Sequence, residues 1–270
     1  MMSTAIGNQI QVGSGPEPGG ISVTDVTVSF TSPDGASRTV LDKFSIETRP
    51  GEFLVLIGRS GCGKTTVLNL LAGLVEADSG EITVVGSPPR AARAKLGYMF
   101  ARDALLPFRT AIENVELGLE VRRIPRSERR QKATALLALL GLSHAGGLYP
   151  WQLSQGMRQR VALARTWALA PQLVLMDEPF AALDAQTRES VRGEFLEMWE
   201  RERSAVVFVT HDLTEALLMG DRVVVMGAGG KVAADVTLPF ARPRDPAELP
   251  FTDEFRALER QLHHLLQDVG

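Results

Sequence analysis

One short segment, residues 58–65, limits the possible folds of this chain more than any other. It reads Gly-Arg-Ser-Gly-Cys-Gly-Lys-Thr and matches the pattern G-x-x-x-x-G-K-S/T. The apolar run at residues 53–57 precedes it, as expected of a strand buried on both faces, and a helical pattern extends from residue 65 to about residue 74. A strand, a glycine-rich loop and a helix in this order predict a phosphate-binding loop in an α/β fold.

The residue types of this loop suit the phosphates of a nucleotide. Its glycines let backbone N–H groups converge on phosphate oxygens without interference from a Cβ atom. Lys64 can reach the β- and γ-phosphates, and the hydroxyl of Thr65 can ligate Mg²⁺. A glycine-rich turn that matches by chance is the alternative, and the flanking strand and helix argue against it. The loop residues expected to bind nucleotide are Gly58, Arg59, Ser60, Gly61, Cys62, Gly63, Lys64, Thr65 and Thr66.

A second apolar run ends in two acids. Residues 173–176 are Leu-Val-Leu-Met, and Asp177 and Glu178 follow directly. Beside a phosphate-binding loop, Asp177 would hold Mg²⁺ through a water molecule, and Glu178 would act as a general base on the attacking water. Taken alone, the two acids could also be solvated side chains at the end of a strand. The presence of the loop favours the functional interpretation, because the two features complete one site.

With these motifs in place, the chain resembles the nucleotide-binding subunits of ABC transporters over about residues 21–240. Residues 153–160, Leu-Ser-Gln-Gly-Met-Arg-Gln-Arg, resemble the signature motif of that family, and residues 181–184, Ala-Ala-Leu-Asp, resemble its D-loop. His211, in Thr-His-Asp, resembles the switch histidine, and Phe30 stands where the family stacks an aromatic ring on adenine. A structural histidine at a strand end is the alternative for His211, and the order of the motifs favours the functional role.

Apolar patterns and the resemblance together divide the chain into three parts. Residues 1–20 are rich in Gly and Pro and predict a flexible segment. Residues 21–243 are expected to form the ABC ATPase domain, with strand patterns that a helical subdomain interrupts at about residues 101–170. Residues 244–270 predict an amphipathic helix. The implied fold is α/β, a P-loop NTPase with a mixed sheet core, an antiparallel β subdomain and an inserted α-helical subdomain.

Local signals predict where helices of the inserted subdomain begin. Thr110 and Glu113 have the spacing of a capping box, and Ser127 is expected to cap a second helix that ends at Gly141. A third helix is predicted to start at Ser154.

The resemblance also implies a site shared between two copies, since two such subunits pair head to tail. Ser154 and the helix behind it would close over the ATP held by Lys64 of the second copy, adding N–H groups near the γ-phosphate. His211 would bond to the γ-phosphate and orient water together with Glu178. The implied catalytic residues are Lys64, Glu178 and His211, the implied Mg²⁺ ligands are Thr65 and Asp177, and the further nucleotide contacts are Phe30, Ser154, Gln155, Gly156 and Asp184.

Two positions depart from the family pattern. Gln155 replaces the first glycine of the signature, which we expect to be tolerated because Gly156 remains. Ala101 occupies the position of the glutamine that normally contacts Mg²⁺ and the attacking water and links hydrolysis to the membrane partner. A methyl group can do none of this. We expect Mg²⁺ to keep Thr65 and Asp177 while water fills the vacated position, and a regulatory subunit with weak hydrolysis is the alternative.

Residues 105–110, Leu-Leu-Pro-Phe-Arg-Thr, resemble a segment of the nitrate, sulfonate and taurine importer ATPases. The resemblance implies a permease as direct partner, an extracytoplasmic solute-binding protein as indirect partner, and a location at the cytoplasmic face of the membrane. Leu105, Leu106 and Phe108 could contact the permease or belong to the core. A soluble ABC-type ATPase without a transport role is the alternative, but such proteins usually carry fused cassettes or long coiled-coil insertions.

Composition excludes several other classes of protein. The net charge of −3 provides no overall basic field for nucleic acid, and the sequence lacks an apolar run of the ~20 residues that a membrane-spanning helix needs. Cys62 is the only cysteine, so an internal disulfide and a cysteine-ligated zinc site are excluded. Cys62 is interpreted as a small loop residue; the alternative is a thiol that Lys64 and the loop N–H groups make easy to oxidise.

Overall fold

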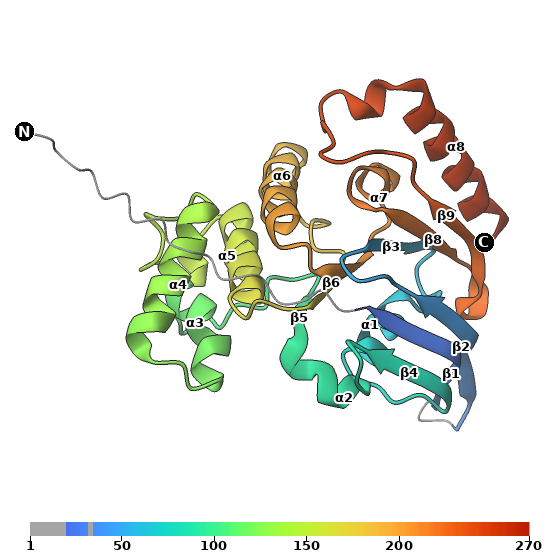
Figure 1. Ribbon diagram of the computed structural model, residues 1–270, viewed down its shortest axis with the longest axis horizontal. Helices are drawn as coiled ribbons and strands as arrows, with labels where there is room; N and C mark the ends of the chain where they lie inside the picture. Colours follow the sequence, from blue (N-terminus) through green and yellow to red (C-terminus); the bar gives the residue numbers. More distant parts are fainter. Residues whose placement is uncertain (1–19, 32–34, 270) are drawn as a thin grey trace, which may run out of the picture.

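The phosphate-binding loop belongs to a mixed sheet whose strands come from distant parts of the chain (Figure 1). The computed structural model describes residues 20–31 and 35–269, and the predicted flexible segment lies outside this part except for Gly20. The strand before the loop pairs in parallel on both sides. In spatial order the strands are β5 (Leu96–Met99), β6 (Leu173–Asp177), β7 (Ala205–Val209), β3 (Phe53–Gly58), β8 (Arg222–Met226) and β9 (Val232–Thr237).

The central strand β3 separates two cores. Leu54 and Leu56 belong to the core that contains α1 (Lys64–Leu71). Phe53 and Val55 belong to the core on the opposite face of the sheet. Every residue of β3 is buried, which explains why its sequence is a continuous apolar run. Strand β9 is antiparallel to β8, and this makes the sheet mixed, as predicted.

An antiparallel sheet covers the other side of α1. Its order is β2 (Ser37–Glu47), β1 (Ile21–Thr31), β4 (Ser79–Val84). Val26 and Val28 of β1 are buried against this helix layer, whereas Phe30 is 45% exposed. The sequence patterns do not predict β2, because only Leu41, Phe44 and Ile46 of this strand are buried and irregular pairing with β1 breaks the alternation.

A lobe of helices lies beside the β5–β6 edge (Figure 1). It contains α3 (Ala111–Val121), α4 (Arg126–Leu139) and α5 (Gln155–Trp167). The capping box at Thr110 and the start of a helix at Ser154 are confirmed. The prediction for Ser127 is wrong: Pro125 occupies the N-cap and Ser127 lies inside the first turn of α4. Proline is tolerated there because the first N–H groups of a helix have no partner within it.

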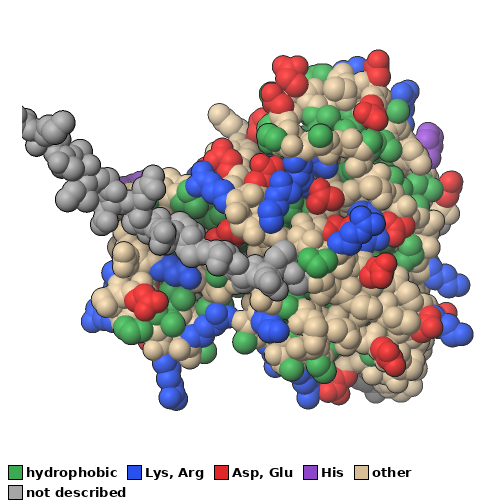
Figure 2. All heavy atoms as spheres, viewed as in Figure 1, with side chains coloured by type: hydrophobic (Ala, Val, Ile, Leu, Met, Phe, Trp, Pro, Cys, Tyr) green, Lys and Arg blue, Asp and Glu red, His purple; other side chains and the backbone are tan. Residues whose placement is uncertain are grey.

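Helices α6 (Ala185–Glu202) and α7 (Leu213–Met219) cover the face of the mixed sheet opposite α1. Helix α8 (Asp253–Asp268) packs against α7 (Figure 1). Phe255 and Leu262 of α8 are buried, as expected from the amphipathic pattern. Among residues 20–31 and 35–269, no helix has the length and apolar character needed to cross a membrane. Basic and acidic side chains are interspersed on the face shown in Figure 2.

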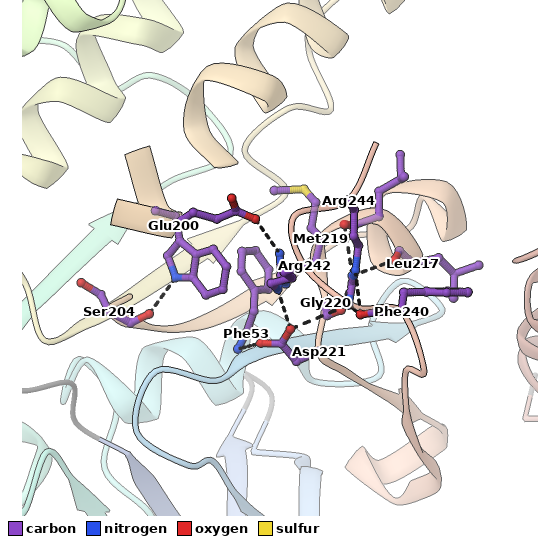
Figure 3. A network of polar contacts seen from close by, with 12 residues as sticks. Phe53, Glu200, Ser204, Leu217, Met219, Gly220, Asp221, Phe240, Arg242 and Arg244 are labelled. Carbon is purple, nitrogen blue, oxygen red and sulfur yellow. Dashed lines mark hydrogen bonds and ion pairs between the residues drawn. The ribbon is translucent and has the colours of Figure 1, made fainter. Parts of the chain in front are cut away.

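Two arginines attach the C-terminal segment to the end of α7 (Figure 3). Nε of Arg242 lies 2.7 Å from Oδ1 of Asp221, and its guanidinium stacks 4.4 Å from the ring centroid of Trp199. Nη1 of Arg244 donates to the carbonyl oxygens of Leu217 (3.0 Å), Leu218 (3.1 Å) and Gly220 (2.6 Å). These carbonyls have no intrahelical donor at a helix C-terminus, so Arg244 satisfies them and caps α7.

Candidate functional site

The phosphate-binding loop connects β3 to α1 and lies against neighbouring strands. Gly63 is the N-cap of α1 and has φ 106°, a conformation that favours glycine. A Cβ atom at Gly63 would lie 2.7 Å from Cδ2 of Leu41, so the packing of β2 also requires glycine here. Glycine at this N-cap therefore lets β2 pack closely against the start of α1.

Lys64 is folded back into this loop. Its Nζ donates to the carbonyl oxygens of Gly58 at 2.7 Å and Arg59 at 3.1 Å, and the side chain is almost fully buried. The positive charge therefore sits at the centre of the loop, where nucleotide phosphates would bind. Cys62 is buried with its Sγ 4.0 Å from Nζ of Lys64, which limits access of reagents to the thiol.

Thr65 and Asp177 meet across the gap between α1 and β6. Oγ1 of Thr65 donates to Oδ1 of Asp177 at 3.3 Å. Burial raises the pKa of Asp177, while the hydrogen bond from Thr65 opposes this effect. A hydroxyl and a single carboxylate at this distance suit Mg²⁺, which prefers oxygen ligands and usually completes its shell with water and substrate phosphates.

Glu178 and His211 form a second pair beside the loop. Nδ1 of His211 lies 3.0 Å from Oε2 of Glu178, and the two side chains are 65% and 33% exposed. The backbone N–H of Glu178 donates to the carbonyl oxygen of Val209, which fixes the end of β6 beside the end of β7. A partly exposed carboxylate that a histidine orients is suited to accept a proton from water.

These residues line adjoining clefts. Gly58, Arg59, Ser60, Lys64, Glu178 and His211 line one of about 600 Å³. Ser60, Gly61, Gly63, Lys64, Thr65, Thr66 and Glu178 line the other together with Arg38 and Val40 of β2. Arg38 pairs with Phe30 across the antiparallel sheet, which brings the predicted adenine-stacking residue to the same strand pair. The sequence patterns miss Arg38 and Val40 because they do not predict β2.

The signature residues line neither of these clefts. Ser154 is the N-cap of α5 and its Oγ accepts from the N–H of Met157 at 3.3 Å, while Gln155 is exposed in the first turn. A Cβ atom at Gly156 would overlap the methyl group of Thr187 in the first turn of α6. The close approach explains why glycine is required at Gly156 but not at the exposed Gln155.

Asp184 starts α6 at this same place. Its Oδ1 accepts from the N–H of Thr187 at 3.0 Å, and this bond holds the pKa of the carboxyl below its usual range. The N-termini of α5 and α6 therefore lie side by side through Gly156 and Thr187. Neither helix start lines the clefts around Lys64 of the same chain.

A network behind His211 was not predicted from the sequence. The buried Glu215 accepts from Oγ1 of Thr210 at 2.7 Å, and Asp212 caps α7 by accepting from the N–H of Glu215. Arg188 of α6 donates to the carbonyl oxygen of Leu183 at 2.9 Å and lies 3.6 Å from Asp212. The residues beside Asp184 and His211 are thus tied to each other. Their contacts depend on packing between α6 and α7, for which the sequence offers no local signal.

The loop after β5 brings Ala101 to the surface. Ala101 and Arg102 are exposed, Leu105 is buried, and Phe108 is 72% exposed. Of the three apolar residues singled out in this segment, Leu105 is therefore a core residue and Phe108 is a surface residue.

Comparison with known proteins agrees with this architecture. The family model for the ABC transporter matches residues 41–181. A taurine import ATP-binding protein of Chromobacterium violaceum is 43% identical over 84% of this chain and 89% of its own length. An aliphatic sulfonates import ATP-binding protein of Cupriavidus pinatubonensis is 41% identical over 92% of this chain and 80% of its own.

Solved structures show the same fold. A dimeric ATP-binding cassette in a post-hydrolysis state with ADP and Pi superposes with a TM-score of 0.72 at 30% identity, covering 82% of this chain and 100% of that one. The sequence match to the ABC transporter family, the shared cassette fold and the clefts around Lys64 lead to one conclusion: this chain belongs to the ATP-binding subunits of ABC transporters and is an ATPase.

Proposed function

We propose that this chain hydrolyses ATP at a head-to-tail dimer interface to drive uptake of a small nitrate-, sulfonate- or taurine-like solute through a membrane permease. The observation that carries the proposal is the gathering of Lys64, Thr65, Asp177, Glu178 and His211 around one phosphate loop. The names of the taurine and sulfonate import relatives support the choice of solute.

Each residue has a role that its contacts suit. Lys64 would exchange the carbonyl oxygens of Gly58 and Arg59 for oxygens of the β- and γ-phosphates. Mg²⁺, held by Thr65 and through water by Asp177, would neutralise charge on these phosphates. Glu178 would accept the proton of the attacking water, and His211, which is hydrogen-bonded to Glu178, would orient that water and contact the γ-phosphate.

A second copy would complete the site. The N-termini of α5 and α6, with Ser154, Gln155, Gly156 and Asp184, would close over the nucleotide bound to the other copy and supply N–H groups to its γ-phosphate. The dimeric state of the solved cassette supports the pairing of two copies. We place the dimer at the cytoplasmic face of the membrane, attached through the permease, with a solute-binding protein as indirect partner.

The test of hydrolysis compares steady-state ATPase rates of the wild type and Glu178→Gln. We expect the variant to retain ATP binding and lose at least about 99% of turnover, because general bases contribute ~10²–10⁴-fold. Glu194→Gln is the control, since Glu194 pairs with Arg160 outside the clefts. Equal rates for wild type and Glu178→Gln would contradict the assignment of the base.

The exposed Ala101 favours a second candidate, a regulatory subunit that binds ATP but hydrolyses it weakly. Ala101→Gln would restore an amide that can contact Mg²⁺ and water. A large increase in turnover of an otherwise nearly inactive chain would favour the regulatory role, whereas substantial turnover by the wild type would support the transport role.

The permease is tested through Phe108, whose ring is 72% exposed. Phe108→Asp should abolish solute uptake in cells while leaving the basal ATPase rate of the purified chain unchanged. Uptake of nitrate, taurine and alkyl sulfonates in a strain that lacks this chain would identify the solute. Equal loss of uptake and basal ATPase would contradict a specific contact with the permease.

A further inference from the structure

Two arginines of α5 hold the loop after β5. Arg165 donates from Nη1 to the carbonyl oxygen of Ala104 and from Nη2 to that of Asp103, both at 2.7 Å. Nε of Arg158 lies 3.0 Å from Oδ2 of Asp103, whose Oδ1 accepts from the N–H of Leu105 at 3.2 Å. These bonds therefore attach the loop that begins at Ala101 to α5.

Arg158 also donates a hydrogen bond at the start of its own helix. Its Nη1 donates to the carbonyl oxygen of Leu153 at 2.8 Å, and Leu153 is the buried residue directly before the N-cap Ser154. One planar guanidinium thus joins the Asp103 carboxylate to the backbone that places Ser154. Lysine lacks this planar fork, so its ammonium would not hold both directed bonds in the same geometry.

We propose that Asp103 and Arg158 are positioning residues that set Ser154 against the loop after β5, the loop that begins at Ala101. The inference rests on the proposed head-to-tail dimer, in which Ser154 meets the nucleotide of the second copy. Neither Asp103 nor Arg158 lines the clefts around Lys64, so neither touches the nucleotide held by its own chain.

The competing explanation is that the pair only stabilises the fold. The exposure of the two side chains helps to distinguish this from a positioning role. The side chains of Arg158 and Asp103 are 30% and 27% exposed. Ion pairs that solvent still reaches contribute modestly to the stability of a fold. Loss of the pair should therefore change the placement of Ser154 far more than the melting temperature.

The experiment measures ATP-dependent dimerisation in a Glu178→Gln background, where slow turnover lets the ATP-bound form accumulate. Asp103→Asn keeps an oxygen for the N–H of Leu105 and removes the charge that faces Arg158. Arg158→Lys keeps the charge and removes the double contact. Glu120→Gln is the matched control, since Glu120 pairs with Arg109 at 2.6 Å in the same lobe, with side-chain exposures of 45% and 29%.

We expect Asp103→Asn and Arg158→Lys to weaken the ATP-dependent dimer about tenfold, measured by analytical ultracentrifugation, a change of ~1.4 kcal/mol. ATP affinity of the monomer, measured at low protein concentration, and the melting temperature should stay at the values of the parent. Glu120→Gln should match the parent in all three measurements.

Different outcomes of this experiment would contradict different parts of the proposal. A parent that stays monomeric with ATP would overturn the proposed dimer and this inference with it. A parent that dimerises, with both variants dimerising as strongly, would overturn the inference alone. Weaker dimers accompanied by an equal fall in melting temperature and monomer ATP affinity would show that the pair is only structural, and equal weakening by Glu120→Gln would show that any lost ion pair in the lobe has this effect.

Discussion

Glu215 is a single side chain on which the region behind His211 depends. It is 3% exposed, its Oε2 accepts from Thr210, and burial raises the pKa of its carboxyl. The folded chain therefore binds this proton more tightly than the unfolded chain does, and the charged form costs stability at neutral pH.

The first prediction replaces Glu215 with glutamine, which keeps an acceptor for Thr210 without the charge. At pH 8 we expect Glu215→Gln to unfold at a temperature equal to that of wild type or up to about 3 °C higher, since 1 kcal/mol shifts the midpoint by ~2–4 °C in a chain of this size. As the pH falls through the raised pKa, the wild type gains its proton and the difference should vanish. Thermal unfolding at pH 8, 7, 6 and 5 measures this; a variant that loses more than about 5 °C at pH 8 would contradict it.

At the scale of elements, α7 connects the catalytic cleft to the C-terminal segment. His211 precedes its N-cap, Arg244 caps its C-terminal carbonyls, and Oγ1 of Thr214 donates to Glu259 of α8 at 3.0 Å. Burial lowers the pKa of Arg244 to about 10, so the guanidinium stays charged at neutral pH. The C-terminal segment thus supports the helix that follows His211.

The second prediction concerns this cap. Arg244→Ala would leave the carbonyls of Leu217, Leu218 and Gly220 with no donor from this side chain, and we expect a loss of about 2–4 kcal/mol in the free energy of unfolding, measured by urea denaturation. Arg256→Ala is the control, because Arg256 only stacks at 6.0 Å on the exposed Phe251. A change below about 1 kcal/mol in Arg244→Ala would show that water caps α7 equally well.

The elements differ in how far sequence could predict them. Strands β3, β6 and β7 were predictable because burial on both faces produces unbroken apolar runs. Helix α6 was not predicted, since only four of its residues, Val191, Phe195, Met198 and Trp199, are buried in a long polar helix. The start of α4 was misplaced because Ser127 and Pro125 both suit the beginning of a helix.

At the scale of the whole molecule, the sequence predicts the part of the site that a single chain forms. Lys64 and His211 follow β3 and β7, and Asp177 ends β6. These strands are parallel neighbours in the mixed sheet, so the motif residues converge at their carboxyl ends. The contacts of Asp103 with Arg158 and of Arg188 with Asp212 join separate elements. Local patterns do not encode such contacts, and packing alone determines them.

The third prediction tests the division of the site between two copies. Ser154→Asp keeps the N-cap of α5 but places a negative charge against the γ-phosphate, and Lys64→Ala removes the phosphate-binding charge. Each variant alone should be nearly inactive. An equal mixture should regain about one quarter of the wild-type ATPase rate, because about half of the dimers are mixed and one of their two sites is intact.

Mixing each variant with an excess of wild type and titrating the ratio provides the control for exchange between dimers. No recovery in an equal mixture, with exchange demonstrated, would contradict a head-to-tail site. Full activity of Ser154→Asp alone would show that α5 does not face the phosphate.

The place of β3 in the sheet also determines when this strand can pair while the chain is being synthesised. Its two hydrogen-bonded neighbours, β7 and β8, begin only at Ala205 and Arg222, although β3 ends at Gly58. A ribosome adding ~5–20 residues per second needs roughly 10–30 s to reach Met226 after Gly58. During that interval the strand that leads into the phosphate loop has no partner on either edge. A nascent chain can therefore complete its phosphate-binding strand, and be stabilised by nucleotide, only when its translation is nearly finished.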